Sequence, residues 1–466
     1  MATFDKARQG GESQQSSLAT QAARQLANTT KTRPQMQGIS PRWLLRMLEW
    51  VEVPGGTFRV NRRQSFTVGD GRLSFVNTGA VVQVIPHELA ELPVLRGLED
   101  EEVFKTLAGQ FVQKEYGRGQ VIKAQGDPAE HICLLAHGRA NRVQRSQYGE
   151  ESLLEVLSDG DHFGDESVIK TEDVWHYTVR AVTPCTVLEL SESVFQGLLK
   201  RIPTLRAHIE KYKERLAKPQ DKHGQAAISL SAGHSGEVIL PGTFVDYDPS
   251  PRQYELNVAQ TILRVHTRVT DLFNEPMDQL QEQLRLCIEA LREQQEDQLL
   301  NNRDFGLLHN TDLKQRIHAR SGVPTPDDMD ELLSRRRRTR FFLAHPRTIA
   351  AFRQECSRQG IYPPETQVEG VTVASWRGVP FLPSDKIPIS SDLTTSILAM
   401  RTGLDHQGVI GLHRTGLPDE VEPGVSMRKM DVDQKAIGTY LVSTYFSVAP
   451  LIADAVGMLE NIELRG

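Results

Sequence analysis

The sequence predicts an α+β protein that carries a separate antiparallel β-barrel or jelly-roll module. A long helical apolar pattern in the second half of the chain is followed by alternating helix and strand patterns, which is typical of α+β layering. Runs of alternating apolar and polar residues between Val112 and Leu190 favour antiparallel strands that close into a barrel. With 466 residues the chain exceeds the usual length of one domain, so we expect two or three domains.

The composition argues against several classes of protein. The chain is 39% hydrophobic and 24% charged, as in ordinary soluble proteins, and its net charge of −6 gives no general attraction to nucleic acid or anionic lipid. The most apolar stretch, Leu441–Val456, is broken by polar residues and a proline, so it predicts buried core and no membrane span. The four cysteines form no CxxC pair, which argues against a zinc ribbon and favours a reducing, cytoplasmic location; they are Cys133, Cys185, Cys287 and Cys356.

Residues 1–38 are rich in Gln, Ser, Thr and Ala and too poor in large apolar side chains to form a core. We interpret them as a flexible N-terminal arm, either a loose tail or an arm that orders against a neighbouring subunit. Residues 39–94 are expected to begin with a short helix that Ser40 caps. They then continue as a long projecting hairpin, whose predicted strands are Thr57–Val60, Ser65–Val68, Leu73–Asn77 and Ala80–Ile85.

Residues 95–218 form the predicted module, and residues 219–236 follow as a linker. Residues 237–466 are expected to open with one long kinked helix, or two helices in series, over Gln253–Leu300, because apolar residues recur at helical spacing. An α+β region comes next. Its predicted elements are a buried strand at Phe341–Ala344, a helix capped by His345, and further strands at Val368–Ala374, Ile397–Arg401, Gly408–Leu412 and Gly438–Val448.

The stretch Ser158–Ala181 contains two glycines, Gly160 and Gly164, that allow sharp turns, and a potential helix start that offers amides to an anion. It resembles the phosphate-binding cassette of cyclic-nucleotide-binding domains. The resemblance extends over Leu95–Lys218, where Leu95–Glu102 is similar to that family's entry helix. It implies a cyclic-nucleotide-like pocket formed by Phe163, Gly164, Asp165, Glu166, Ser167, Trp175, Tyr177 and Thr178.

This pocket departs from the family's pattern where the phosphate would bind. Asp165 holds the position of the acid that accepts from the ribose hydroxyl, but Glu166 follows where an apolar residue is usual. Trp175 replaces the family's phosphate-binding arginine, and Arg180 is expected to face the other side of its strand. One lost hydrogen bond to a charged group weakens binding by roughly 10–150-fold. We therefore expect cAMP and cGMP to bind weakly or not at all and assign no cofactor; another ligand, or a role as a docking surface, stays open.

The rest of the chain carries a second resemblance. A projecting hairpin and a long helix precede an α+β region, in which Leu343–Asp385 contains Pro-Arg-Thr, Gly-Val-Pro and Ser-Asp in order. This order resembles the major capsid proteins of tailed phages and their cellular relatives, the encapsulin nanocompartment shells. Together with the module it resembles the insert-bearing subgroup of the second encapsulin family, over about Thr32–Gly466.

The second resemblance implies a homo-oligomeric icosahedral shell of about 60 copies, in which closed symmetry repeats one set of contacts. It also implies a cargo enzyme, such as a terpene cyclase, prenyl-chain synthase, cysteine desulfurase or sugar kinase. The connections around Pro93 and Lys218–Ser235 are expected to be flexible, so the module should be dispensable for assembly.

Other candidate sites have simpler structural interpretations. Cys356 and His345 are predicted on a helix and at its start, where a buried thiol and a capping imidazole are favoured over a nucleophile and its base. The histidines form no ligand cluster, so we assign no metal. The basic run Arg335–Arg338, with Arg340, follows acidic residues that can pair with it, so an ion-paired surface is favoured over a nucleic-acid patch.

Two other classes of function are weighed against a shell subunit. A cyclic-nucleotide-responsive regulator would place a helix-turn-helix directly after the module, but Pro219–Ser235 has the composition of a linker. An enzyme with a regulatory insert would need a catalytic constellation, and the sequence contains no P-loop, HExxH or GxSxG motif. We therefore expect a structural shell protein that is not an enzyme and binds neither nucleic acid nor membrane.

Overall fold

The structure is a computed structural model, and it describes residues 20–27, 33–61, 63–68, 71–145, 151–165, 174–216, 242–247, 251–272, 274 and 277–464. The chain forms two compact units. Unit 1 comprises Met1–Val60, Arg252–Thr311 and Gln315–Gly466, and unit 2 comprises Asn61–Pro251 with Asp312–Lys314. Unit 1 mixes helices with two large sheets and a two-stranded one, and unit 2 contains a β-barrel, which confirms the α+β class with a barrel module.

Unit 1 contains a six-stranded sheet built around its longest strand, β26 (Ile437–Pro450), whose inward side chains are almost continuously buried. The sheet order is β1-β23-β26-β25-β24, and β16 also pairs with β26 over ten consecutive residues. The other strands are β1 (Glu49–Glu52), β16 (Asn257–His266), β23 (Val409–His413), β24 (Glu420–Glu422) and β25 (Val425–Val432).

A second sheet of unit 1 has seven strands in the order β17-β27-β22-β18-β21-β20-β19. Its central strand β18 (Phe341–Ala344) is buried at all four residues, as predicted. Helix α10 (Pro346–Arg358) follows, and the ring of His345 accepts a hydrogen bond from the Arg347 amide, which confirms the predicted cap. The remaining elements are β17 (Arg316–His318), α9 (Pro326–Ser334), β19 (Glu365–Val368), β20 (Val371–Trp376), β21 (Val379–Pro383), β22 (Thr394–Met400) and β27 (Val456–Glu463).

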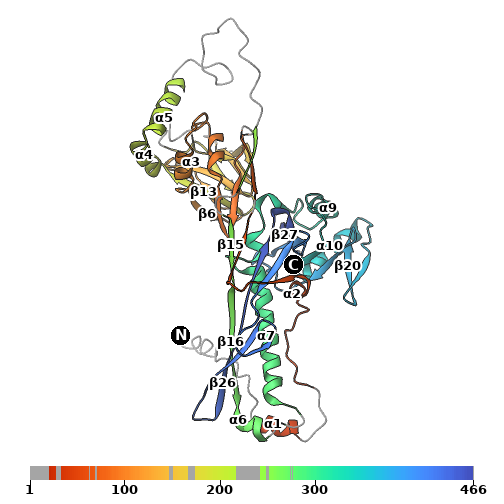
Figure 1. Cartoon of the computed structure of the whole chain (residues 1–466). Coiled ribbons are helices and arrows are strands. Elements are labelled where there is room, and N and C mark those ends of the chain that lie inside the picture. The colour runs from red at the N-terminus through yellow and green to blue at the C-terminus, as the bar shows by residue number, and fades with distance from the viewer. Residues whose placement is uncertain are drawn as a thin grey trace, which may run out of the picture. The chain divides into compact units, whose positions relative to one another are not determined.

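Helix α7 (Gln279–Asn301) is the long helix of unit 1 and runs alongside β16 and β26 (Figure 1). Asp278 caps the start of this helix, because its side chain accepts a hydrogen bond from the Gln281 amide. Ile288 and Leu291 are buried in the same core cluster as Leu263 of β16 and Phe446 of β26. The short helices α6 (Thr267–Leu272) and α8 (Leu307–Asn310) flank α7 along the chain, and the N-terminal α1 spans Thr20–Ala27.

The expectation of helix over the first part of Gln253–Leu300 is wrong, because this part forms β15 (Arg252–Glu255) and β16. Along β16 the burial alternates, with Leu263 and Val265 buried and Ile262 49% exposed. Val258, Ile262 and Val265 satisfy a helical spacing by coincidence. The strand-favouring residues of β16 and its long ladder with β26 decide the conformation.

The predicted hairpin is made differently from the expected one. In unit 1, β2 (Thr57–Val60) pairs with β15, with Val60 opposite Arg252. In unit 2, β3 (Arg63–Val68) pairs with β14 (Gly242–Tyr247). Each N-terminal strand of the hairpin thus finds its partner more than 170 residues later in the chain, so the module interrupts the hairpin instead of following it.

Unit 2 also begins earlier than the expected boundary at Leu95. Strands β4 (Phe75–Thr78) and β5 (Val81–Val84) pair with each other and, with the 3-10 helix Pro86–Glu91, pack into the apolar core of this unit. Residues on both sides of Pro93 are buried there, so Pro93 is not in a linker. Leu95 lies in a turn, and the expected entry helix starts only at α3 (Glu101–Ala108), where Asp100 caps it.

Unit 2 contains the predicted antiparallel barrel, which consists of two four-stranded sheets with the orders β10-β9-β12-β7 and β11-β8-β13-β6. Helices α4 (Glu192–Arg201) and α5 (Pro203–Leu216) follow, with the predicted interruption next to Pro203. The strands are β6 (Val112–Tyr116), β7 (Val121–Lys123), β8 (His131–His137), β9 (Ala140–Arg145), β10 (Glu151–Leu157), β11 (His162–Phe163), β12 (Thr178–Ala181) and β13 (Cys185–Ser191). The predicted linker 219–236 lies outside the described residues.

Acidic residues of α7 hold the chain segment that precedes β1. Glu293 accepts hydrogen bonds from the amide and the hydroxyl of Ser40, each at 2.8 Å, and Arg42 lies 2.5 Å from Glu289. The expected cap by Ser40 is therefore wrong, because its hydroxyl is engaged on α7. Helix α2 (Trp43–Met47) instead begins after Arg42, which has a left-handed backbone (φ 49°) and makes no side-chain cap.

Glu296, the next acidic residue along this face of α7, is 99% buried and receives long hydrogen bonds from the Leu45 amide at 3.5 Å and from Ser384 at 3.4 Å. Burial, reinforced by the charge of Glu293, raises the pKa of Glu296 to about 7, although the amide contacts and Lys386 oppose the shift. At neutral pH, Glu296 therefore destabilises unit 1 by being partly charged in an apolar site.

We predict that Glu296→Gln removes a pH dependence of stability. Because the folded pKa is raised above the unfolded value, the proton on Glu296 stabilises the fold fully below pH 4.5, and this contribution is lost as the pH rises through about 7. The variant should unfold with a free energy about 2–3 kcal/mol higher than the parent at pH 8 and unchanged at pH 4.5. Denaturant unfolding at the two pH values measures this. Glu289→Gln, which loses the ion pair with Arg42, should destabilise at pH 8 instead.

A second prediction follows from the pairing of Val60 with Arg252. Joining these residues through Asn-Gly, with deletion of residues 61–251, closes β2 and β15 with a two-residue turn. Unit 1 should then remain soluble and unfold cooperatively. Deletion of residues 95–218 leaves Leu73, Phe75, Val82, Val84 and Leu89 without their core partners and should aggregate. Equal solubility of the two deletions would contradict a module boundary at Asn61.

Candidate functional site

The cassette region lies in unit 2, and the structure describes six of its eight predicted pocket residues. Glu166 and Ser167 lie outside the described residues. Gly160 (φ 93°) and Gly164 (φ 85°) form the predicted turns, and the left-handed region favours glycine at both positions. Phe163 and Trp175 are buried in one core cluster, with Tyr177 packed against it.

Trp175 fills the core beside the turn at Gly164. Its ring lies 6.0 Å from that of Phe163 and 5.5 Å from that of Tyr177, both in edge-to-face arrangements. A Cβ atom at Gly164 would approach the Trp175 ring to 2.5 Å, so only glycine fits beneath this indole. Trp175 is 97% buried and also joins the backbone of Gly126 and Asp127 through two 2.8 Å hydrogen bonds. The residue at the family's cation position is thus part of the barrel core.

Arg180 does not replace the missing cation. On β12, Val179 and Ala181 point into the core that contains Trp175, whereas Arg180 lies on the other face and pairs with Glu151 at 3.3 Å. This confirms the expected orientation. The hydroxyl of Thr178 accepts a hydrogen bond from the Gln125 amide at 3.0 Å, so it too is engaged within the module.

Asp165 lies in an apolar neighbourhood. It is 92% buried and borders a gap of about 10 Å³ with Leu190 and Phe195, room for one water molecule at most. His162 lies at ion-pair distance from its carboxylate, 3.8 Å away. The carboxylate expected to meet a ribose is therefore surrounded mainly by side chains of the core.

The sequence analysis missed Arg142, which contributes a cation from the neighbouring strand β9. Its guanidinium lies 4.5 Å from the centre of the Tyr177 ring and pairs with Glu155 at 2.9 Å. Arg142 lies opposite Val179 in the register, so it shares the inward face of the sheet. The sequence did contain a signal, because Ala140 and Arg142 are two residues apart on β9 and therefore lie on the same face of the strand. A charged residue on the inward face departs from the usual pattern of apolar residues inside and polar residues outside.

A buried acid, Glu189 of β13, forms the densest charge cluster of the barrel. Lys114 lies 2.8 Å and Lys123 3.2 Å from its carboxylate, and the Tyr116 hydroxyl donates to it at 2.7 Å. Burial alone would raise the pKa of Glu189, but these hydrogen bonds and positive charges lower it overall. The carboxylate of Glu189 is therefore an internal anion of the barrel that already pairs with Lys114 and Lys123.

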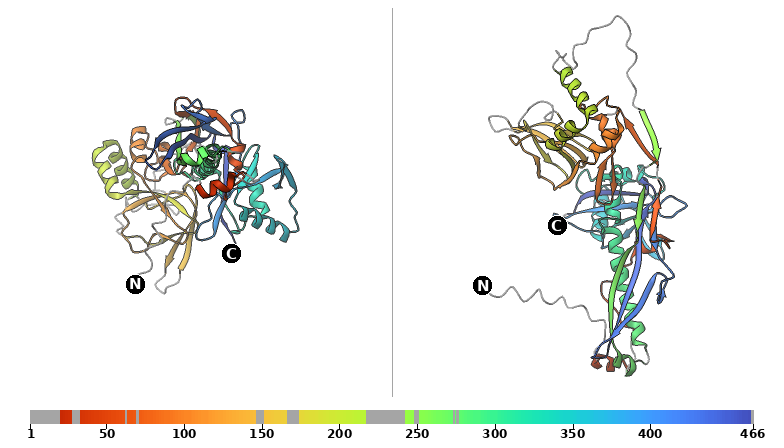
Figure 2. Two further views of the ribbon diagram at one scale, coloured as in Figure 1. Left: turned by 90° about the horizontal axis from the view of Figure 1, so that it is seen from below. Right: turned by 60° about the vertical axis from the view of Figure 1, so that its left-hand side comes forward.

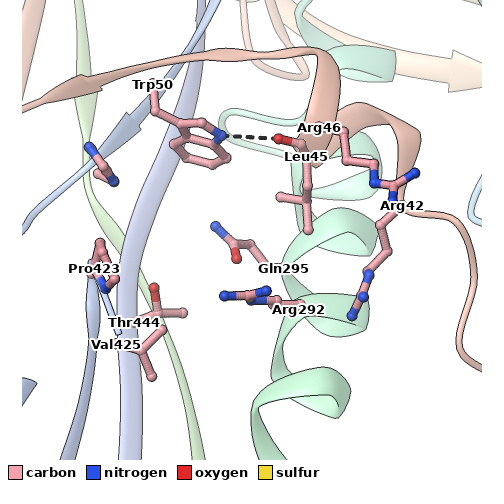
Figure 3. A pocket seen from close by; sticks show the side chains of 11 residues that line it. Arg42, Leu45, Arg46, Trp50, Arg292, Gln295, Pro423, Val425 and Thr444 are labelled. Carbon is pink, nitrogen blue, oxygen red and sulfur yellow. Dashed lines mark hydrogen bonds between the residues drawn. The ribbon is translucent and has the colours of Figure 1, made fainter. Parts of the chain in front are cut away.

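Unit 1 contains a cavity of about 450 Å³ between α2, α7 and the six-stranded sheet (Figure 3). Arg292 and Gln295 reach into it from α7, Arg42 and Arg46 border it near α2, and Trp50 of β1 forms one wall. The sequence analysis did not find this cavity, because its lining comes from four segments that are far apart in the chain.

Three arginines of the basic run that was considered as a nucleic-acid patch make contacts within the protein. Arg336 is half-buried against Gly457 and donates to the carbonyl groups of Leu332 and Gln315, and its partial burial lowers its pKa to about 10. Arg335 pairs with Glu331 at 2.6 Å. Arg340 donates to the Thr402 hydroxyl at 2.9 Å.

Cys356 is fully buried in the core of unit 1, and burial raises the pKa of its thiol to about 11, which suits a structural thiol. Among the described residues, no helix is both long and apolar enough to cross a bilayer.

Comparisons with known proteins agree with both resemblances. The model of the family described as "Type 2A encapsulin shell protein SrpI-like" matches residues 213–466, and that of the cyclic nucleotide-binding domain matches residues 113–202. The type 2A encapsulin shell protein SrpI of Synechococcus elongatus is 47% identical over 238 residues, which cover 51% of this chain and 78% of that protein. A type 2A encapsulin shell protein of Mycolicibacterium paratuberculosis is 45% identical over 239 residues, with the same coverage.

A solved structure extends the similarity to the fold. The cryo-EM structure of the holo-SrpI encapsulin complex of Synechococcus elongatus matches 97% of this chain and 98% of its own chain, with a TM-score of 0.54 and 30% identity. Unit 1 is therefore a tailed-phage capsid-like fold, and the whole is a capsid-like shell protein with an inserted cyclic-nucleotide-binding domain. The chain belongs to the SrpI-like family of type 2A encapsulin shell proteins.

The relatives differ from this chain by about the length of the module. An alignment of 238 residues that makes up 78% of SrpI implies about 305 residues for that protein, about 160 fewer than here. Unit 2 spans residues 61–251, which is slightly more than this difference.

Proposed function

We propose that this protein is the structural subunit of an icosahedral nanocompartment, built from about 60 copies of itself by closed symmetry. The observation that carries the proposal is its similarity, over 97% of the chain, to the subunit of an encapsulin complex. Family membership favours this function over the cyclic-nucleotide-responsive regulator. A shell subunit needs surfaces that meet other copies, and α1 with the rest of the N-terminal arm is one candidate for such a contact.

The enclosed partner is an enzyme, and the family resemblance suggests a terpene cyclase, prenyl-chain synthase, cysteine desulfurase or sugar kinase. The compartment would lie in the cytoplasm, since neither the sequence composition nor the family suggests export. In this proposal the chain itself performs no catalysis, and its contribution is containment and co-localisation of the cargo.

The inserted domain is proposed to be a degenerate cyclic-nucleotide site. Three features support this: the indole of Trp175 in the core at the cation position, the pairing of Arg180 with Glu151 on the outer face, and the apolar surroundings of Asp165. A cyclic phosphate would meet no free bidentate arginine from the cassette. The module then acts through its surface or through another ligand.

The assembly prediction is a particle of about 3 MDa, from about 60 copies of a 52.2 kDa chain. Size-exclusion chromatography with light scattering on the purified chain measures this mass directly. A stable monomer or dimer at micromolar concentration would refute the shell proposal.

Removal of residues 1–32 should lower the assembled fraction if the arm clamps a neighbouring copy, and leave it unchanged if the arm is a tail.

The ligand prediction concerns cyclic nucleotides. Titration calorimetry of the assembled protein with cAMP and with cGMP should give dissociation constants well above 1 µM, because the phosphate lacks its cation; a loss of roughly 10–150-fold is expected. A cAMP dissociation constant near or below about 1 µM would show that the assignment of Trp175 is wrong. The Arg142→Gln variant serves as a comparison, since it removes a cation from the inward face of β9.

A further inference from the structure

The cavity of unit 1 is lined by donors of hydrogen bonds and by no acidic residue. Arg42, Arg46 and Arg292 border it, together with the polar groups of Gln295 and Thr444. Each guanidinium has five N–H donors in a planar fork, a geometry that suits carboxylates and phosphates. A molecule that enters this cavity therefore meets cationic donors before any acceptor of similar strength.

The acids that balance these arginines lie outside the lining. Arg42 pairs with Glu289 and Glu293, at 2.5 and 3.6 Å, on its side facing α7. Arg46 pairs with Glu369 at 3.3 Å, and Arg292 pairs with Glu422. These pairs fix the guanidinium groups while engaging only one or two donors of each among the described contacts. Positions that are fixed in advance lower the entropy cost of binding an anion.

One wall of the cavity is a rigid aromatic surface. The indole N–H of Trp50 donates to the Leu45 carbonyl at 3.1 Å, which sets the plane of the ring (Figure 3). A Cβ at position 411 would come within 2.7 Å of this ring, so Gly411 lets it lie flat on β23. The His413 ring stands 5.5 Å away, and burial lowers its pKa although Glu52 and Glu420 oppose the shift. At neutral pH this wall is uncharged and apolar.

We propose that the cavity binds a small ligand that combines a planar ring with a phosphate or carboxylate. The anionic group would lie among the arginines and the ring against Trp50. The volume of about 450 Å³ is within the range of sites for small molecules. This site is separate from the cyclic-nucleotide-like module, since all of its residues belong to unit 1. It also does not depend on the shell proposal, because one copy of the chain provides every lining residue.

The test uses three probes on the full-length protein in the state in which it is purified. AMP carries both a planar ring and a dianion, adenosine carries the ring alone, and inorganic phosphate carries the charge alone. Titration calorimetry should give AMP a dissociation constant below about 1 mM, with adenosine and phosphate each at least about 10-fold weaker. Equal affinity for AMP and phosphate would overturn the role of the Trp50 wall, and no binding of AMP at about 1 mM would overturn the site.

Two matched variants locate the binding. Arg292→Gln removes a lining guanidinium whose side chain is 40% exposed, and it should weaken AMP binding about 10-fold or more. Arg353→Gln makes the same change at an ion pair of similar exposure, that of Arg353 with Glu365, away from the cavity, and it should leave AMP affinity unchanged. An equal effect of both variants, or none from Arg292→Gln, would place AMP elsewhere and overturn the proposal. Unchanged particle mass and melting temperature show that the variants are folded.

Discussion

The packing of α7 on the β16–β26 ladder is the contact on which unit 1 depends. The apolar face of the helix shares one core with Leu263 and Phe446, and its acidic face holds the segment around Ser40 and Arg42. The same helix supplies Arg292 and Gln295 to the cavity (Figure 2 shows α7 beside both strands from a second direction). A displacement of α7 would therefore disturb the core, the N-terminal segment and the cavity together.

In the module, one aromatic side chain, Trp175, is central to the proposal of a degenerate site. An arginine at position 175 would be a cation that needs a counter-charge, whereas the indole is uncharged and packs against Phe163 and Tyr177. The charges of the barrel are consequently balanced from within, by Glu189 with its lysines and by Glu155 with Arg142. This internal balance of charge supports the proposal that the module is a degenerate cyclic-nucleotide site.

Elements that depend on a local sequence pattern were predicted correctly. Elements that depend on pairing between distant parts of the chain were missed. The barrel strands, the buried strand β18, the cap at His345 and the orientation of Arg180 each follow from alternation, composition or capping chemistry within a few residues. The helix expected over β16 failed because its apolar residues fit both periods, and only the partner β26 selects the strand. The hairpin and the boundary at Asn61 depend on partners beyond the module, and the cavity depends on four separate segments.

The position of the insertion has a consequence for how this fold tolerates new parts. Val60 and Arg252 are opposed residues of one antiparallel pair, so the two chain ends that leave unit 1 are about 5 Å apart. The spacing of these ends is therefore one geometric requirement that the fold places on an inserted domain. A domain whose own termini lie close together meets this requirement. The end of the hairpin is thus a natural grafting point, where the chain can gain a function while its wall-forming half is selected independently.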